Sequence, residues 1–355
     1  MKKSLIVMVL IAVLVTACAG GAQPAASDAS SASEVEVSSA PAVEVTKLRI
    51  AQQFGLGYAA LTIADEFDLF EKYLPGLEVE WLQLGSGGAI REAFIAGEVD
   101  VASMGIPPFI IGWDAGIPWK VVSGLCVMPL SLQTYKEEVN SLSDLTAEDR
   151  IAYPSPGSIQ HILLSMAVEN ELGSPTALDD IGIAMAHPDA AAALINKKDI
   201  TAHFTSPPYN FEELSNEGIK VLVDGTEAFG TEFTFLVAVA SDDFFKNNPM
   251  VYSAFVMGLA EASNFINENP EEAAKILAPS FSLDEETTLK YLTWPGMNYV
   301  TTPLGLMGFS EFMQNAGYIE KVPEKLSDIA FPNMLAAIGH GQGSEGVLET
   351  LQVRP

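Results

Sequence analysis

The sequence predicts an α/β protein with two domains, each a mostly parallel sheet flanked by helices, and a cleft between them. β-like runs alternate with helical stretches from residue 47 onward, the pattern of a parallel sheet covered by helices. A similar alternation recurs later in the chain. Residues 47–355 are also too many for one typical domain.

The first alternation shows the helical and strand periods most clearly. Apolar residues at 58–73 recur at helical spacing and stop before Pro75. Those at 77–81 alternate with glutamates, as in a half-exposed strand. Parallel strands joined by helices bind ligands outside their carboxyl ends. The predicted elements are a strand at 47–52, a helix at 58–73, a strand at 77–81, a helix at 89–96 and a strand at 99–104.

Two similar helix-to-strand corners suggest that the second domain repeats the first. Residues 93–97 precede Asp100 and a strand, and residues 193–197 precede Asp199 and another. Any two such corners can look alike, so a chance likeness stays open. We expect residues 233–239 to return as a strand to the first domain, with mostly helical segments after it. The predicted domains are therefore 47–128 with 233–355, and 129–232.

The N-terminus predicts export and lipid attachment. Lys2 and Lys3 precede an apolar run, Leu5–Val15, which is too short to span a bilayer and is typical of a signal peptide. Val15-Thr16-Ala17-Cys18 resembles the lipobox of bacterial lipoproteins, so we expect cleavage after residue 17 and lipidation of Cys18; the alternative is an ordinary cysteine beside a simple cleavage site. Residues 18–46, rich in Ala, Ser, Gly and Pro, form a flexible tether. The predicted location is extracytoplasmic, lipid-anchored to the membrane.

Charge and cysteine content exclude several functions. The formal net charge of −28 makes nucleic acid and anionic lipid surfaces unsuitable partners. Cys126 is the only cysteine besides Cys18, so an intramolecular disulfide in the mature chain and a multi-cysteine metal site are both excluded.

Five loops between predicted strands and helices are candidates for ligand binding. Glycines allow close backbone approach, N–H groups at helix starts attract negative charge, and hydroxyls can donate hydrogen bonds. In the alternative, the hydroxyls only cap helices. The candidates are Gln53, Phe54, Gly57 and Tyr58 in loop one, Ser86 and Gly87 in loop two, Gly105, Ile106 and Pro107 in loop three, Ser155, Gly157 and Ser158 in loop four, and Ser206, Pro207 and Tyr209 in loop five.

The side chains in and near these loops indicate the kind of ligand. Phe54, Tyr58, Tyr209 and Phe233 could form a stacking wall for an aromatic or heterocyclic group. None of the five loops contains Lys or Arg, and we expect Arg91 in the following helix to face solvent. A neutral or weakly anionic, partly aromatic ligand is therefore at least as plausible as a sulfonate.

Enzyme motifs are few, and we expect no catalytic, metal or cofactor site. Gly55-x-Gly57-x-x-Ala60 fits the dinucleotide fingerprint, but nicotinamide cofactors are scarce outside the cytoplasm. The sequence contains no G-x-S-x-G, Walker A or HExxH motif. Of the histidines, we expect His161 and His203 to be structural.

Two segments resemble a known family of binding proteins. LRIAQQFGLGYAALTIADEFDLFEKYLPGLEVEWLQLGSGGAIREAFIAGEVDVASMGIPPF (48–109) and DITAHFTSPPYNFEEL (199–214) resemble the nitrate/sulfonate/taurine and thiamine-pyrimidine (NMT1/THI5-like, SsuA-like) periplasmic binding proteins. The cysteine-rich motif of the fungal pyrimidine synthases in the wider family is absent, so their activity is not carried over.

The resemblance implies a fold and a role. It implies a bilobal type II periplasmic-binding fold with a hinge cleft, acting as the substrate-binding protein of an ABC transporter. The protein would deliver a heterocyclic, pyrimidine-like ligand, or a sulfonate, nitrate or taurine-like one, to a permease with its own ATPase. We expect a monomer. The alternative is a secreted α/β enzyme that uses the same cleft.

Overall fold

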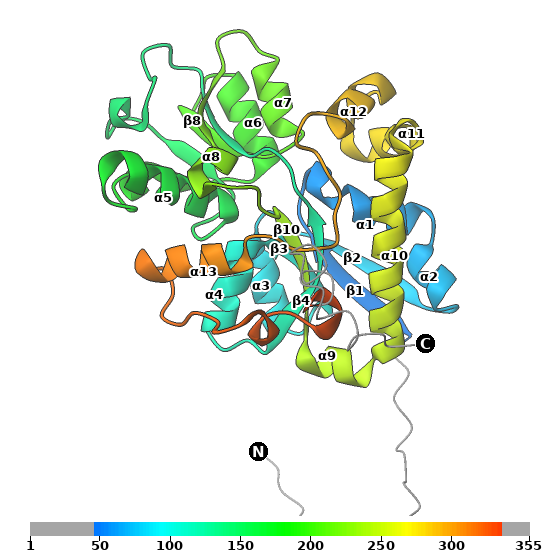
Figure 1. Cartoon of the computed structure of the whole chain (residues 1–355). Coiled ribbons are helices and arrows are strands. Elements are labelled where there is room, and N and C mark those ends of the chain that lie inside the picture. Colours follow the sequence, from blue (N-terminus) through cyan, green and yellow to red (C-terminus); the bar gives the residue numbers. More distant parts are fainter. Residues whose placement is uncertain (1–45, 336–355) are drawn as a thin grey trace, which may run out of the picture. The chain divides into compact units, whose positions relative to one another are not determined.

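The computed structural model describes residues 46–335, and two five-stranded sheets with flanking helices account for most of them (Figure 1). The predicted signal peptide, Cys18 and nearly all of the predicted tether lie outside the described residues. Within them, no helix is both long and apolar enough to cross a membrane.

The first sheet has the strand order β2-β1-β3-β10-β4. β1 pairs in parallel with β2 and β3, whereas β10 pairs antiparallel with β3 and β4, so four strands point one way and β10 points the other. The strand that returns from the C-terminal side therefore lies inside the sheet. The bounds are β1 Lys47–Gln52, β2 Glu78–Gln83, β3 Val101–Gly105, β4 Trp119–Cys126 and β10 Leu236–Ser241.

The second sheet has the order β7-β6-β8-β5-β9 and the same pattern of directions. β6 pairs in parallel with β7 and β8, and β5 pairs antiparallel with β8 and β9. The two similar helix-to-strand corners noted in the sequence lead into β3 and β8. Each of these strands is the third in the spatial order of its sheet. The bounds are β5 Ser131–Thr134, β6 Ile151–Tyr153, β7 Gly182–Ala184, β8 Ala202–Thr205 and β9 Lys220–Asp224.

The chain changes sheets twice, once between Cys126 and Ser131 and again between Asp224 and Leu236. We therefore keep residues 129–232 as the proposed second domain. After β10 the chain stays with the first sheet: the Val127 N–H donates to the Asn298 carbonyl at 2.8 Å, and the Val121 N–H donates to the Ile329 carbonyl at 2.9 Å.

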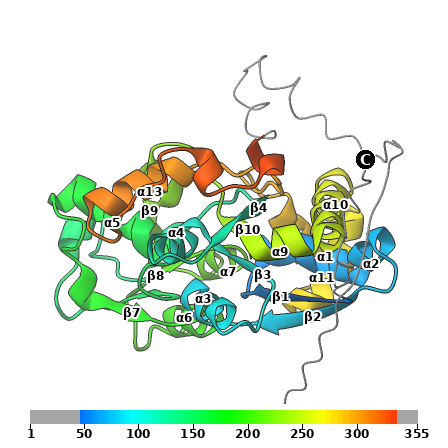
Figure 2. The same ribbon diagram turned by 90° about the horizontal axis from the view of Figure 1, so that it is seen from below.

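Helices cover both sheets, and most follow the predicted pattern (Figures 1 and 2). The helix predicted at 58–73 is instead divided, because Asp68 adopts a left-handed φ of 49° that ends one helix and precedes the next. With the first sheet lie α1 Ala59–Glu66, α2 Leu69–Tyr73, α3 Gly87–Ile95, α4 Ile106–Asp114, α9 Asp242–Asn247, α10 Pro249–Glu268, α11 Pro270–Phe281, α12 Glu285–Leu292 and α13 Leu306–Asn315.

The second sheet carries α5 Ile159–Leu172, α6 His187–Ile195, α7 Tyr209–Leu214 and α8 Gly225–Phe229. Short 3₁₀ helices occupy Leu56–Tyr58, Leu142–Asp144, Asp179–Ile181 and Leu326–Asp328.

The core of the first domain depends on the long helix α10. Phe255 of α10 is fully buried and stacks on Phe70 of α2, with ring centroids 5.3 Å apart. Gly258, one turn later, allows this approach, because a Cβ there would lie 2.7 Å from Cδ1 of Phe70. α10 therefore joins the C-terminal half of the chain to the N-terminal sheet.

We predict that Phe255→Ala lowers the free energy of unfolding by about 3–5 kcal/mol, because it removes a fully buried ring and leaves a cavity. Phe67→Ala is a matched control: Phe67 is 40 % exposed and has a single edge-on aromatic partner, Phe265, so the loss should be about 1 kcal/mol. Urea unfolding of both variants measures the difference. Equal losses would contradict this role of α10.

Candidate functional site

Loops from both sheets meet at the carboxyl ends of β1, β3 and β8. The Leu56 N–H, just after β1, donates to the carbonyl of Pro207, just after β8, at 3.0 Å. Gly55 is required at this contact: its φ is 113°, and a Cβ would lie 2.9 Å from the Pro207 carbonyl oxygen. Nearby, a Cβ on Gly105 would lie 3.1 Å from Cβ of Ile159. The two lobes therefore touch along loops one, three, four and five.

A small cavity, here called the inner cavity, lies between these loops. Its volume of about 10 Å³ is at the limit of what one water molecule needs. The inner cavity therefore has no space for an organic solute, and the lobes are in contact around it. The inner cavity is lined by Gln53, Phe54, Tyr58, Gly87, Gly105, Pro108, Ser158, Ile159, Gln160, His187, Phe235 and Leu236.

A larger cavity, the outer cavity, shares Gln53, Phe54 and Tyr58 with the inner one. Its volume of about 530 Å³ lies within the range of small-molecule sites. It too takes residues from both sheets, together with the end of α11. Its other lining residues are Gln52, Gly55, Leu61, Thr62, Asp65, Glu66, Trp81, Gln83, Pro208, Tyr209, Glu212 and Ser280–Ser282.

The outer cavity is acidic and aromatic. Asp65, Glu66 and Glu212 line it, and no Lys or Arg of the described chain lines either cavity. Asp65 accepts a 2.6 Å hydrogen bond from Nε1 of Trp81. Burial raises the pKa of Glu212. An anionic ligand would therefore find neutral donors and negative charge here, but no cation.

Two shared residues hold each other in place. Nε2 of Gln53 donates to the Tyr58 hydroxyl at 2.7 Å, and the Tyr58 side chain is buried. Burial raises the pKa of Tyr58 well above its ordinary value, so the hydroxyl stays neutral. The Gln53–Tyr58 pair is thus a fixed polar edge between the two cavities.

The structure brings about half of the predicted site residues to these cavities. The predicted residues that line one or both are Gln53, Phe54, Tyr58, Gly87, Gly105, Ser158 and Tyr209. Gly57 packs instead against Phe235 and Leu236, and Gly157 against Ile111. Ile106 and Pro107 are buried at the start of α4 and, like Pro207, line neither cavity.

The predicted serines divide into two groups. Ser86 and Ser158 accept hydrogen bonds from the backbone N–H of Ala89 and His161, at 3.2 and 3.3 Å, so their hydroxyls cap helices as the alternative interpretation expected. The hydroxyls of Ser155 and Ser206, by contrast, are buried and have no hydrogen-bond partner within the described chain. Like Ser86, however, these two predicted serines line neither the inner nor the outer cavity.

Phe233 lies away from both cavities. Its ring packs edge-on against Phe229 and Phe309, with centroids 5.2 and 5.4 Å apart, in an aromatic cluster between α8 and α13. Phe235, two residues later, lines the inner cavity in its place.

Several residues that line the cavities were not predicted, because no local sequence pattern indicates them. Gln160 and His187 lie in the first turns of α5 and α6, and their position beside a cleft depends on how the second sheet is assembled. The Ser158 cap just before Gln160 was the one available signal. Asp65, Trp81 and Ser280 come from segments far apart in the chain.

The histidines of the second domain are all hydrogen-bonded. His161 accepts from the Gly157 N–H at 3.0 Å and lies 3.4 Å from Asp179. His203 is fully buried between His187 and Glu213. The predicted structural role of His161 and His203 agrees with these contacts, whereas His187 also reaches the inner cavity.

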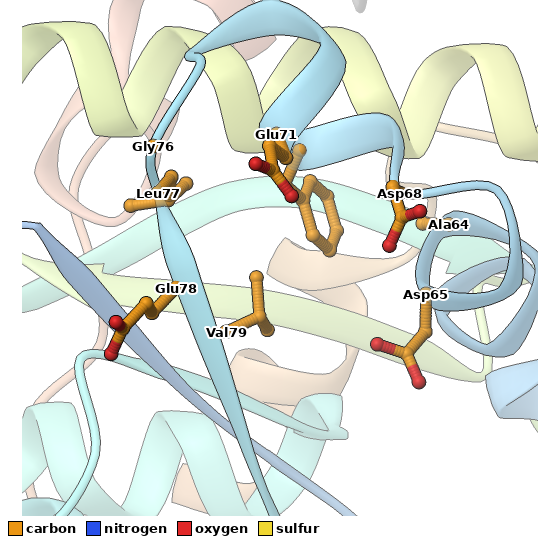
Figure 3. Close-up of a pocket in the computed structure, with 9 residues that line it drawn as sticks. Ala64, Asp65, Asp68, Glu71, Gly76, Leu77, Glu78 and Val79 are labelled. Atoms are coloured by element: carbon orange, nitrogen blue, oxygen red, sulfur yellow. The ribbon is translucent and has the colours of Figure 1, made fainter.

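A third cavity, of about 570 Å³, lies outside the meeting of the loops. It is bordered by α1, α2 and β2, and carboxylates of Asp65, Asp68, Glu71 and Glu78 surround it (Figure 3). All its lining residues belong to the first sheet and its helices, and none of the predicted loop residues is among them. We therefore place the site at the inner and outer cavities.

Comparisons with known proteins agree with the predicted fold and family. The chain is 25 % identical over 248 residues, 69 % of its length and 75 % of the relative's, to a protein of Escherichia coli K12 named for binding aliphatic sulfonates.

Solved structures of two binding proteins share the architecture of this chain. The alkanesulfonate-binding protein of Xanthomonas axonopodis pv. citri superposes with a TM-score of 0.66 at 20 % identity, over 79 % of this chain and 96 % of that one. The periplasmic nitrate-binding protein of Synechocystis PCC 6803 also gives a TM-score of 0.66, at 16 % identity, over 84 % and 90 %.

These likenesses confirm the predicted two-domain α/β periplasmic-binding fold. The model of the NMT1-like family matches residues 41–279, well over half of the sequence, and the chain therefore belongs to that family.

Proposed function

We propose that the chain is an extracytoplasmic solute-binding lipoprotein of an ABC importer, which captures a small organic molecule between its two lobes and delivers it to a permease. The observation that carries this proposal is the pair of adjoining cavities, lined by loops from both sheets at the carboxyl ends of their strands. The related proteins named for sulfonate and nitrate binding support it.

Capture of a ligand in the inner cavity requires the lobes to separate. The inner cavity of about 10 Å³ admits no organic molecule, so the contacts at Leu56–Pro207 and Gly105–Ile159 must open first. Two segments connect the sheets, at residues 127–130 and 225–235. We propose that these act as the hinge, because a few residues in connecting segments commonly absorb such closures.

The lining favours an uncharged, partly aromatic ligand over a sulfonate or nitrate. Three carboxylates lie at the outer cavity and no Lys or Arg of the described chain reaches either cavity. The rings of Phe54, Tyr58 and Tyr209 suit a flat heterocycle.

A thermal-shift screen tests this function. We expect a pyrimidine or riboflavin-like heterocycle to stabilise the protein more than taurine, nitrate or alkanesulfonates, by about 2.7 kcal/mol at 100 times its Kd. Chemical conversion of a bound compound during incubation would instead support the secreted-enzyme alternative. Binding of the anions alone would contradict the ligand class.

We predict that Tyr209→Ala weakens binding of any ligand found by the screen by roughly three- to tenfold, because a lost aromatic contact costs about 0.5–1.5 kcal/mol. Tyr135→Ala is the control, since Tyr135 lies in the same domain but lines neither cavity. Isothermal titration of both variants gives the comparison. Unchanged affinity of the Tyr209→Ala variant would show that Tyr209 does not contribute to ligand binding.

We also predict that Cys18→Ala releases the protein from membranes into the soluble fraction, because it removes the only proposed lipid attachment. Cys126→Ala should stay with the membrane fraction, since the Cys126 thiol is buried in the core. Fractionation of cells that express each variant is the measurement. Membrane retention of Cys18→Ala would exclude the lipid anchor while leaving solute binding untouched.

A further inference from the structure

A chain of hydrogen bonds leads from the inner cavity into the core of the second domain. Nε2 of His187 lies 3.0 Å from the side-chain amide nitrogen, Nε2, of Gln160, so an N–H on His187 requires the Gln160 amide to turn its oxygen toward the ring. Nδ1 of His187 lies 2.9 Å from Nε2 of His203, whose Nδ1 lies 2.5 Å from Oε1 of Glu213. His203 and Glu213 are 0 % exposed, and Gln160 and His187 are buried at the edge of the inner cavity.

The imidazole of His187 is held in place on several sides. The ring of Tyr209 stacks on it, with centroids 5.7 Å apart and planes inclined by 24°. The Thr205 hydroxyl lies 3.5 Å from its Nδ1. A ring held in this way can exchange its proton between nitrogens but cannot easily turn its other nitrogen toward the cavity.

The proton at the inner end determines the direction of every hydrogen bond in the chain. A neutral imidazole has one N–H donor and one acceptor nitrogen. If Glu213 is protonated, it donates to His203, His203 donates through Nε2 to His187, and Nε2–H of His187 is a donor at the cavity. If Glu213 loses that proton and both rings stay neutral, each bond reverses and His187 presents an acceptor.

The surroundings of Glu213 favour the protonated, uncharged form of its carboxyl group. Its only ion-pairing partner among the described residues is His203, and its Oε2 has no hydrogen-bond partner there. An ionised carboxylate is costly in such a place. Burial raises the pKa of Glu213 to about 9, lowers that of His203 to about 3, and lowers that of His187. A shift of the shared proton from Oε1 to Nδ1 of His203 would leave the outward direction unchanged.

We propose that Glu213 acts as a positioning residue that fixes His187 as an uncharged N–H donor at the binding cavity. The ligand then meets His187 with an acceptor atom, such as an unprotonated ring nitrogen or a carbonyl oxygen, while Gln160 turns its amide to match. This inference rests on the proposed solute-binding function and specifies its ligand: a heterocycle that offers an acceptor to His187. It makes His187 a determinant of specificity.

Nitrogen NMR of the full chain labelled with ¹⁵N-histidine tests the proposal without any ligand. We expect His187 and His203 to be neutral with the proton on Nε2 throughout pH 6–8, with His187→Gln and His203→Gln used only for assignment. A charged imidazolium or an Nδ1–H tautomer at His187 would overturn the proposal, and it would do so without touching solute binding by other residues.

A second measurement, the pH dependence of stability, tests whether Glu213 is protonated in the folded protein. Because its folded pKa lies above the unfolded value, the folded state holds an extra proton, and stability should fall as pH rises from 7 toward 9. The histidines give the opposite slope, but only below about pH 7, where the unfolded rings take up protons.

Glu213→Gln should lose this decline in stability, whereas the neighbouring control Glu212→Gln should keep most of it. Urea unfolding at pH 7, 8 and 9 compares the three proteins. Equal slopes in wild type and Glu213→Gln would show that Glu213 is ionised in the folded protein, which overturns the proposal. Failure of every compound in the thermal-shift screen, with the expected tautomers present, would count against the solute-binding function alone.

Discussion

The site depends on the position of β10 inside the first sheet. β10 pairs with both β3 and β4, and between β4 and β10 the chain leaves the first sheet, builds the second and returns. Leu236, at the start of β10, pairs with Gly105 at the end of β3 and with Cys126 at the end of β4. The crossings between sheets therefore occur at the edge where strand ends expose their loops, and this topology creates the cleft.

Closure of that cleft determines how strongly its polar side chains can hydrogen-bond to a ligand. In a closed space of about 10 Å³, at most one water molecule can compete for the donors of Gln160 and His187. The same exclusion raises the cost of an unpaired charge. The proposed site, which lacks Lys and Arg but holds neutral donors, would therefore recognise the pattern of acceptors on a ligand more than its net charge. The outer carboxylates Asp65, Glu66 and Glu212 strengthen this preference by repelling anions.

Local patterns in the sequence predicted the elements and loops well, and long-range positions poorly. Period-2 alternation identified β2, helical spacing identified the segment that holds α1 and α2, and glycine and hydroxyl content identified loops one to five. The break at Asp68 was missed because its left-handed conformation has no signal in the apolar spacing. Phe233 was predicted as a site residue at the start of the returning strand, but β10 begins three residues later, at Leu236, and Phe235 lines the inner cavity. His187 was missed because its neighbours Gln160, His203 and Glu213 come from three different elements.

The histidine chain belongs entirely to the second domain, and this affects how the protein would bind. Gln160, His187, His203 and Glu213 lie on α5, α6, β8 and α7, all packed on one sheet. In the proposed opening, Gln160 and His187 would become exposed to solvent, whereas His203 and Glu213 would stay in the core of the second domain. The proposed direction of the hydrogen bonds would thus be the same in the open and the closed protein. A ligand that enters the open cleft therefore meets a donor that is already oriented, so closure need not spend free energy on ordering it. Closure then adds the groups of the first domain, Gln53 and Tyr58, around a ligand already held by the second.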